Sequence, residues 1–218
     1  MKRPRYLDLS AAVIATLGWI GAIGALHYLS AGFLHLLSGV DKFGLYFTNW
    51  ASIMTAVVFT GIAAGNVQLS RRTILGHVVV TLAIVFAMYW SFQGLDHFFR
   101  SPFSQKIVHL LLFPMVGAYW LVTSRYDTAR WRNIPTWTFW PLLYTVYGMS
   151  RGYLTGSYPY EQANIEVFGA VWILGIIAAT AIAALAFGAL LVFWDKRLGP
   201  IVAQRLGRGA APRCDGTT

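Results

Sequence analysis

The chain has 218 residues, of which 57% are apolar, 16% aromatic and only 11% charged. A soluble domain carries roughly a quarter charged residues, so this composition excludes an ordinary water-soluble fold and favours a membrane protein. The formal net charge of +9 keeps nucleic-acid binding open until the cations are located along the chain.

Apolar stretches of helical length follow one another along the whole chain. Each of six stretches is long enough, at about 1.5 Å per residue, to cross a hydrocarbon layer of about 30 Å. They cover roughly 9–36, 44–66, 73–95, 106–124, 137–155 and 166–194. The sequence therefore predicts an all-α fold, an integral membrane bundle of six transmembrane helices over residues 1–195. The basic tail 196–218 is rich in Gly and Pro and is expected to be disordered.

The lysines and arginines are divided unevenly between the two predicted sides of the membrane. Thirteen of the 17 fall in the N-terminal segment, the connections around 71–72 and 125–132, and the C-terminal tail, which all share one side. The other side carries only Lys42, Arg100, Lys106 and Arg151. The positive-inside rule then puts both termini in the cytoplasm. Because topology accounts for the positive charge, no nucleic-acid partner is expected.

Two polar side chains at the start of the second predicted span, Thr48 and Asn49, indicate a site, because polar groups are costly in lipid. Thr48 lies about 6 Å below the mouth of its span, and His109 lies about as deep in the fourth span. Both spans enter from the same side, so a hydroxyl and an imidazole can meet, which is the minimum for nucleophilic catalysis. Helix capping or interhelical hydrogen bonding is the alternative role for all three residues.

Pro114 follows His109 by five residues. A proline lacks the N–H that would reach the carbonyl of Leu110, so it is expected to leave that acceptor free close to His109. This free acceptor gives His109 a structural alternative to a catalytic role.

The other histidines allow a metal or haem only as an alternative. His27 and His35 are expected two turns apart on one face of the first span. Haem between two helices would need facing histidine pairs. No ligand spacing indicates structural zinc. A loose cluster of acids and histidines on the outer side could bind a metal, comprising His35, Asp41, Asp96, His97 and His109. We predict no cofactor and no metal site.

Three cations stand on the side of the membrane that is otherwise poor in cations: Arg100, Lys106 and Arg151. One interpretation is that they extend to the interface and pair with Asp96 or Glu161. The other is that they form a rim that receives a lipid carboxylate or phosphate.

The chain resembles the androgen-induced and androgen-dependent TFPI-regulating membrane proteins, whose prokaryotic relatives are the six-span Pr6Pr type. Three segments carry the resemblance in order and spacing: GLYFTNWASIMTAVVF, KIVHLLLFPMVGAYW and YLTGSYPYEQANIEVFG. Members of that family hydrolyse fatty acid esters of hydroxy fatty acids (FAHFA) with an intramembrane threonine nucleophile and a histidine. Thr48 matches the threonine, and His109 before Pro114 matches the histidine. Tyr158, Pro159 and Tyr160 match a Tyr-Pro-aromatic segment that is expected at the pocket.

The resemblance implies a threonine hydrolase that takes a lipid ester from the bilayer, in a bacterial inner membrane. Thr48 is then the nucleophile and His109 the general base. Further candidates are Asn49 and Gln105 as oxyanion donors, Asp96 as the acid that orients His109, and Lys106, Arg100 and Arg151 for a substrate carboxylate. The alternatives are a lipid or small-molecule transporter or binding protein, and an outer-side haem or metal redox protein. The sequence assigns no oligomeric state.

Overall fold

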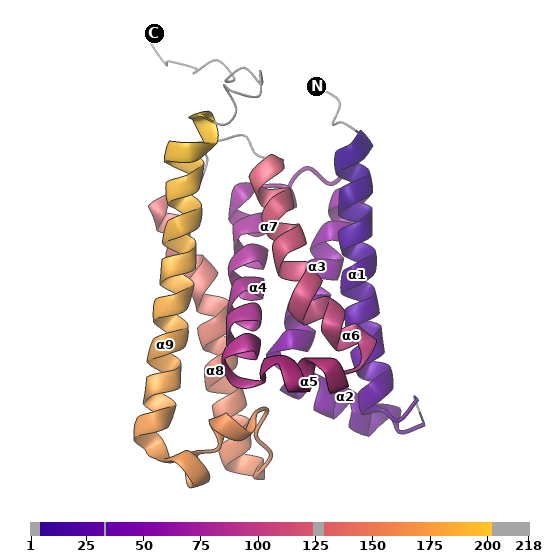
Figure 1. Ribbon diagram of the computed structural model, residues 1–218, viewed down its shortest axis with the longest axis vertical. Helices are drawn as coiled ribbons and strands as arrows, with labels where there is room; N and C mark the ends of the chain where they lie inside the picture. Colours follow the sequence, from indigo (N-terminus) through magenta and orange to yellow (C-terminus); the bar gives the residue numbers. More distant parts are fainter. Residues whose placement is uncertain (1–4, 33, 124–128, 202–218) are drawn as a thin grey trace.

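The computed structural model describes residues 5–32, 34–123 and 129–201. Every regular element in these ranges is helical (Figure 1), which confirms the all-α prediction. The helices are α1 (Arg5–Leu29), α2 (Leu36–Leu45), α3 (Phe47–Ala63), α4 (Arg72–Phe92), α5 (Gly94–Arg100), α6 (Phe103–Lys106), α7 (Phe113–Val122), α8 (Ile134–Thr155) and α9 (Ile165–Phe193). π-helical turns cover Ile107–Leu112 and Trp194–Leu198, and short 3₁₀ turns cover Trp131–Asn133 and Glu161–Ala163.

Several of these helices are long and apolar enough to cross a membrane. Four stretches of the described chain qualify individually: Arg5–Leu29, Arg72–Phe92, Phe103–Val122 and Ile165–Ile201. The pair α2 and α3 qualifies as a fifth if its two helices, bent by 94°, form one span. α8 has 22 residues, but its tyrosines, threonines and Arg151 keep it out of this set. The described residues therefore contain four or five candidate spans, which is compatible with a multi-pass membrane protein.

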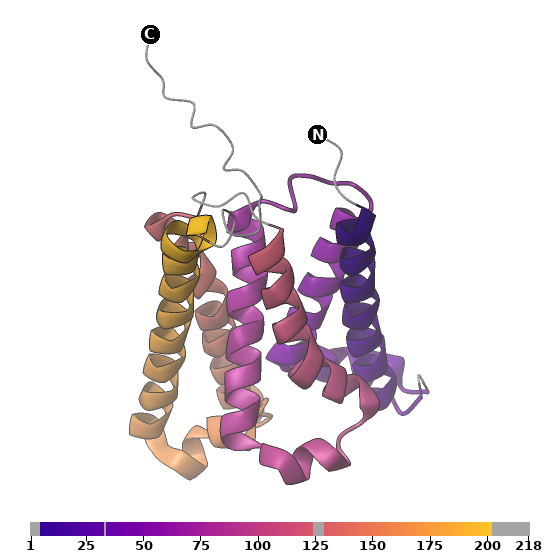
Figure 2. The ribbon, with the colours of Figure 1, turned by 45° about the horizontal axis from the view of Figure 1, so that its top comes forward.

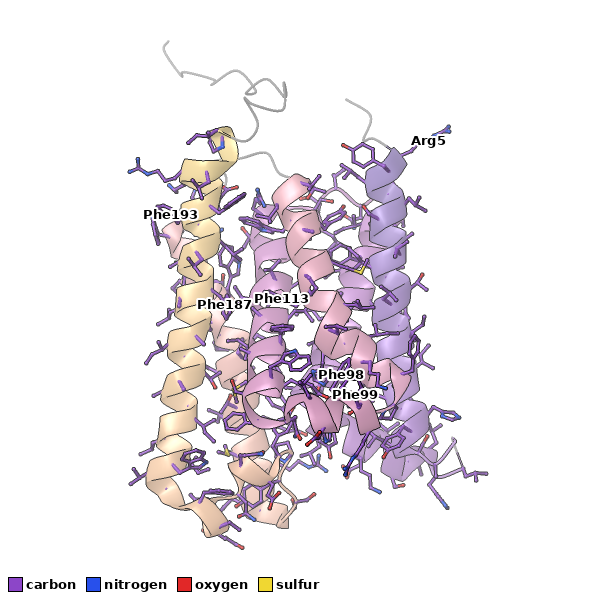
Figure 3. All side chains as sticks on the ribbon, in the orientation of Figure 1. Arg5, Phe98, Phe99, Phe113, Phe187 and Phe193 are labelled. Carbon is purple, nitrogen blue, oxygen red and sulfur yellow. The ribbon has the colours of Figure 1, made fainter. Side chains whose placement is uncertain are left out.

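The long helices stand side by side, and Arg5 of α1 lies at the same end of the bundle as Phe193 of α9 (Figure 3). At the opposite end α5 runs across the bundle from α4 to α6, and α6 continues through the π-helical turn into α7 (Figure 1 and Figure 2). Close approach of α1 to α3 depends on Gly18, where a Cβ would lie 2.9 Å from the backbone nitrogen of Ala56. The bundle thus has one end with both ends of the described chain and another end that α5 crosses.

The first predicted span, 9–36, is wrong at its C-terminal end. α1 stops at Leu29, and the chain turns through Ala31 and Gly32, which have φ angles of 49° and 73°. α2 begins afresh at Leu36 with His35 as its N-cap. His27 and His35 therefore do not share a helix face, because the turn interrupts the helical period between them.

The second predicted span starts with a bend instead of a straight helix. Tyr46 is extended, with φ −100° and ψ 127°, and serves both as the C-cap of α2 and as the N-cap of α3. The bend starts α3 at Phe47, so that Thr48 lies in its first turn and is 6% exposed. A helix N-terminus, with backbone N–H groups that have no partner within the helix, therefore lies inside the protein.

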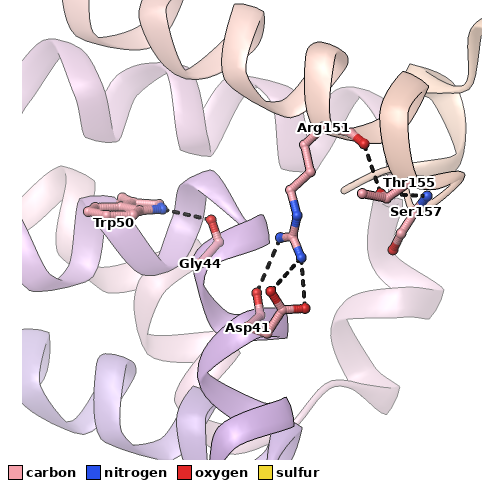
Figure 4. A network of polar contacts seen from close by, with 6 residues as sticks. All are labelled: Asp41, Gly44, Trp50, Arg151, Thr155 and Ser157. Carbon is pink, nitrogen blue, oxygen red and sulfur yellow. Dashed lines mark hydrogen bonds and ion pairs between the residues drawn. The ribbon is translucent and has the colours of Figure 1, made fainter.

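Side chains from α3 and α8 donate hydrogen bonds to the backbone carbonyl groups at the C-terminal end of α2. These hydrogen bonds run from Asn49 Nδ2 to Phe43 O at 2.9 Å, from Trp50 Nε1 to Gly44 O at 2.9 Å (Figure 4), and from the Tyr144 hydroxyl to Leu45 O. Because backbone carbonyls left unpaired in an apolar environment are costly, these bonds stabilise the bend.

The remaining predicted spans correspond to helices with shifted ends. The third predicted span, 73–95, corresponds to α4, which begins one residue earlier and already ends at Phe92. The fourth, 106–124, corresponds to Phe103–Val122, which begins three residues earlier. α9 departs from helical geometry at Gly169, which has a φ of 78°. The predicted disorder of the tail 196–218 is wrong for 196–201, which are helical, and its remainder, 202–218, lies outside the described residues.

Candidate functional site

A cavity of about 450 Å³ lies at the end of the bundle where α5 crosses. α3, α4, α8 and the loop before α9 form much of its wall, and both Thr48 and His109 are part of it. Much of the wall is apolar, with Ile84, Val85 and Met88 among the lining residues. A cleft of this size with a few convergent polar groups is the usual form of a small-molecule site.

Thr48 is held by the first turn of α3. Its backbone carbonyl accepts a hydrogen bond from Ser52 Oγ at 3.0 Å. Its side chain contacts Tyr160, which comes from the loop between α8 and α9. The nucleophile candidate is thus buried at a helix N-terminus and faces a phenol hydroxyl.

Tyr160 is half-buried, and its ring packs edge-on against Tyr46 with centroids 5.9 Å apart. Burial raises the pKa of the Tyr160 phenol above its ordinary value. Hydrogen-bonding contacts from the Thr48 side chain and from the backbone N–H groups of Phe47 and Thr48 lower this pKa, against the larger effect of burial. These contacts place the phenolic oxygen at the N-terminus of α3.

His109 lies in the π-helical turn before α7 and is 6% exposed. Its ring stacks on Tyr89 at a centroid distance of 3.7 Å and an interplanar angle of 17°. Nε2 lies 3.1 Å from Gln105 Oε1. Because an amide oxygen only accepts, Nε2 carries the proton and Nδ1 has the lone pair. Nδ1 is buried and has no hydrogen-bond partner among the described residues.

The π-helical turn brings a second carbonyl into the neighbourhood of Pro114. In π geometry an N–H pairs with the carbonyl five residues earlier, which for position 114 is the carbonyl of His109. The indole of Trp90 donates to that carbonyl at 3.3 Å from Nε1. The free acceptor expected at Leu110 stays a prediction.

Thr48 and His109 line the same cavity, but no hydrogen bond joins them in the described part of the chain. Thr48 contacts Tyr160, and His109 pairs with Gln105. The cavity, and not a direct bond, connects the two side chains.

The supporting residues predicted from the sequence divide into two groups. Gln105, Pro159 and Tyr160 lie on the cavity wall. The Asn49 amide donates to the Phe43 carbonyl of α2, so Asn49 makes the interhelical hydrogen bond that was the other alternative and does not cap α3. The others lie off the wall: Asp96 is exposed on α5, Pro114 lies in α7, and Tyr158 packs on Gly152 of α8. Gln105 takes the position at His109 that was expected for Asp96.

The three predicted rim cations have different environments. Arg151 binds the Asp41 carboxylate with Nη2 at 2.7 Å from both oxygens (Figure 4), so its partner is neither Asp96 nor Glu161. Lys106 donates from Nζ to the carbonyl of Phe99 at 3.1 Å. Arg100 lies on the cavity wall and forms no ion pair or hydrogen bond with any residue that the structure describes.

The histidines and acids at this end do not form a metal centre. Within the described ranges, no group of three or more His, Cys, Asp or Glu residues is placed to hold a metal ion. Asp41 is engaged by Arg151, and His35 is exposed at the start of α2. His97 and His109 both contact the ring of Tyr89, with centroids 5.9 Å and 3.7 Å away.

A buried ion pair lies at the other end of the bundle, and sequence analysis did not find it. Arg72 Nη2 lies 2.8 Å from Asp195 Oδ1, and the two side chains are 6% and 0% exposed. Arg72 also donates to the Trp120 carbonyl at 2.6 Å, and Asp195 accepts from the Ala129 N–H at 2.8 Å. In the sequence, Arg72 and Asp195 appear only as one charge at each of two span ends. They are 123 positions apart, and no spacing pattern indicates that they pair.

The chain was also compared with known proteins. No family model, no curated protein and no solved structure matches it, so the resemblance in three segments remains a prediction from the sequence.

Proposed function

We propose that the chain is an intramembrane hydrolase of lipid esters, with Thr48 as nucleophile and His109 as general base. The observation that carries this proposal is the shared cavity, whose wall includes both side chains. The buried Nδ1 of His109, without a partner among the described residues, supports a basic role. The three resembling segments favour the same pair, and the prokaryotic form of that family favours a bacterial inner membrane.

The proposed topology has six spans, with the bent pair α2 and α3 as the second and α8 as the fifth. Both termini are cytoplasmic in this proposal, and the cavity lies near the outer leaflet. The excess of Lys and Arg on one side favours this orientation. The common position of Arg5 and Phe193 at one end of the bundle supports an even number of spans.

In the first chemical step Thr48 Oγ attacks the ester carbonyl carbon, and the carbonyl electron pair moves onto the carbonyl oxygen. His109 Nδ1 takes the hydroxyl proton. The N–H groups of Phe47 and Thr48 at the start of α3 are fixed donors suited to the negative oxygen. When the intermediate collapses, the ester C–O bond breaks and the proton on His109 passes to the leaving oxygen.

In the second step water releases the acyl group from Thr48. His109 Nδ1 takes a proton from the water, whose oxygen attacks the acyl carbon. The bond from that carbon to Thr48 Oγ then breaks, and Oγ recovers the proton from His109. The products are a carboxylic acid and a hydroxy compound, and both residues return to their initial state.

The cavity chemistry favours an amphipathic ester with an acidic group, such as FAHFA. Its apolar wall suits acyl chains. Of the three predicted cations, Arg100 is the one whose guanidinium has no ion pair or hydrogen bond among the described residues, so it is the candidate for a substrate carboxylate.

The test is ester turnover by the purified full chain in detergent, with a FAHFA substrate. Thr48→Ala is expected to lower kcat by about 10⁴-fold or more, because it removes the nucleophile. His109→Ala is expected to lower kcat by about 10²–10⁴-fold. Thr180→Ala is a matched control, because Thr180 is buried on the same wall and its hydroxyl only returns to the Ile176 carbonyl. Wild-type rates in both active-site variants would end the proposal.

A lipid transporter or binding protein is the second candidate, because Thr48 and His109 share the cavity without a hydrogen bond between them. Such a protein would retain intact ester after purification and release it unchanged. An outer-side haem or metal protein is the third candidate, and it would absorb visible light. Mass spectrometry of the incubated ester, together with one absorption spectrum, separates these alternatives from the hydrolase.

A further inference from the structure

The short helix α5 presents two chemically different faces. Gln93, His97 and Arg100 follow one another at helical spacing and lie on the cavity wall. Leu95 and Phe99 lie about 150° away from them around the helix axis, at about 100° per residue. The side chains of Leu95 and Phe99 are 62% and 70% exposed. A helix on the surface of a soluble protein has the opposite orientation, with its apolar face toward the protein.

A ring contact with α4 fixes this orientation of α5. The ring of Phe98 packs on Trp90 of α4, with the centroids 5.5 Å apart and an interplanar angle of 34°. Phe99 is the next residue of the helix, so its side chain leaves the axis about 100° away from that of Phe98. Figure 3 shows both rings at the end of the bundle where α5 crosses. α5 is therefore anchored through Phe98, and its neighbour Phe99 faces away from the bundle.

The position of α5 in the chain locates it at the edge of a bilayer. One candidate span, Arg72–Phe92, ends directly before it, and another, Phe103–Val122, begins directly after it. The 21 residues of α4 extend over about 30 Å, which matches the thickness of a hydrocarbon layer. Because α5 runs across the bundle, it stays near the level at which both spans end. α9 extends beyond α5 at this end, so α5 is not the outermost part of the protein (Figure 1).

The apolar surface of α5 continues onto the start of α6. Phe103, the first residue of α6, is 72% exposed. Arg100 lies between Phe99 and Phe103 in the chain, and a guanidinium binds the phosphate groups of lipid headgroups well. Phe and Leu on one face, with a basic residue on the other, are typical of helices that lie in the interface of a membrane. The composition of α5 therefore matches a lipid surface better than water.

We propose that α5 is an interfacial helix whose apolar face, formed by Leu95 and Phe99 and continued by Phe103, inserts into the outer leaflet of a phospholipid bilayer. The polar face of the same helix lines the cavity, so α5 separates the cavity from the lipid. An ester whose acyl chains stay in the leaflet then reaches Thr48 and His109 past α5, without crossing water. The inference rests on the membrane topology of the proposed function.

The experiment measures whether a nitroxide label on α5 touches lipid, with the full chain reconstituted in phosphatidylcholine vesicles. The sequence has one cysteine, so Cys214→Ser gives a background in which Phe99→Cys carries the only label. Collisions of the label with oxygen, which concentrates in lipid, are compared with collisions with a nickel chelate, which stays in water. Val67→Cys is the matched control, because Val67 is 72% exposed in the connection between α3 and α4, at the opposite end of the bundle (Figure 2). The oxygen-to-nickel ratio should be about tenfold or more higher at position 99 than at position 67, because a polar chelate does not enter hydrocarbon.

A third label separates the inference from the topology on which it rests. Ile182→Cys places it on the candidate span Ile165–Ile201, at a residue that is 66% exposed. If this label touches lipid while the label at position 99 has the ratio found at position 67, α5 lies in water and the inference is wrong. If neither reagent reaches position 99, another protein chain covers α5 and the inference is also wrong. If the label at position 182 behaves like that at position 67, the proposed topology itself fails.

A second measurement tests the entry route for the ester. The double variant Leu95→Ser with Phe99→Ser removes the apolar face of α5 and keeps its polar face. In vesicles it should raise KM for a long-chain ester held in the bilayer by about fivefold or more, with kcat unchanged. KM for a water-soluble short-chain ester should stay at the wild-type value. An unchanged KM for the long-chain ester would contradict entry past α5. The label experiment needs no turnover, so it decides the position of α5 even if no ester is hydrolysed.

Discussion

The buried ion pair between Arg72 and Asp195 allows a test of stability that is separate from catalysis. Asp195→Leu removes the carboxylate 2.8 Å from Arg72 Nη2 and leaves a guanidinium that is 6% exposed. The Trp120 carbonyl remains as a neutral acceptor, and the Trp120 ring still lies 3.6 Å from Arg72 Cζ. Removing one partner of a buried pair typically costs about 3–5 kcal/mol, because the other charge stays buried without its counter-charge. We expect a loss of this size in the free energy of unfolding.

The assay is reversible unfolding in mixed detergent and SDS micelles, followed by tryptophan fluorescence. The double variant Arg72→Met with Asp195→Leu removes both charges and is expected to recover at least about half of the loss. Arg72 lies about 25 Å along α4 from Tyr89 of the cavity, at about 1.5 Å per residue. The kcat of the folded fraction should therefore stay unchanged. A single variant that loses less than about 1 kcal/mol, or a double variant less stable than both singles, would refute the reasoning.

Two further predictions concern the cavity. Gly152→Ala places a methyl group against the ring of Tyr158, so it should displace the loop before α9. We expect it to lower kcat by about tenfold or more in the turnover assay. Gly117→Ala is the control, because the new Cβ meets open space, and it should match wild type in the same assay. Arg100→Gln should raise KM for an acidic ester by up to about fivefold and leave KM for its methyl ester unchanged, whereas Lys106→Gln should affect neither. Equal KM values for the acid and its methyl ester in wild type would contradict a carboxylate role for Arg100.

The sequence predicts the helical class and two candidate residues of the cavity for a clear physical reason. Polar side chains in apolar spans are costly, so Thr48 and His109 stand out from their positions, and the resemblance selects the same pair. Their similar predicted depths agree with their common place on the wall of one cavity. Tyr160 could be placed at the pocket only through the resemblance, because its position on the cavity wall depends on the bend at Tyr46 and on the packing of a loop.

Other features depend on contacts that no local pattern records. The end of α1 depends on Ala31, a non-glycine residue with a φ of 49°, which sequence patterns do not anticipate. The partner of Arg151 is Asp41, 110 positions away, and two acids closer in sequence were the more obvious candidates. Pairing across such separations is decided by tertiary packing, so sequence reasoning finds the charges but not their partners.

The π-helical turn at Ile107–Leu112 has a consequence for comparing this chain with others. Such a turn is an α-helix with one extra residue, and one residue corresponds to about 100° of rotation around a regular helix. An alignment that forbids gaps inside a span would pair His109 with the neighbour of its true counterpart in any protein whose fourth span is a regular helix. A comparison with such a helix therefore needs a single-residue gap within Ile107–Leu112 before a histidine is judged present or missing.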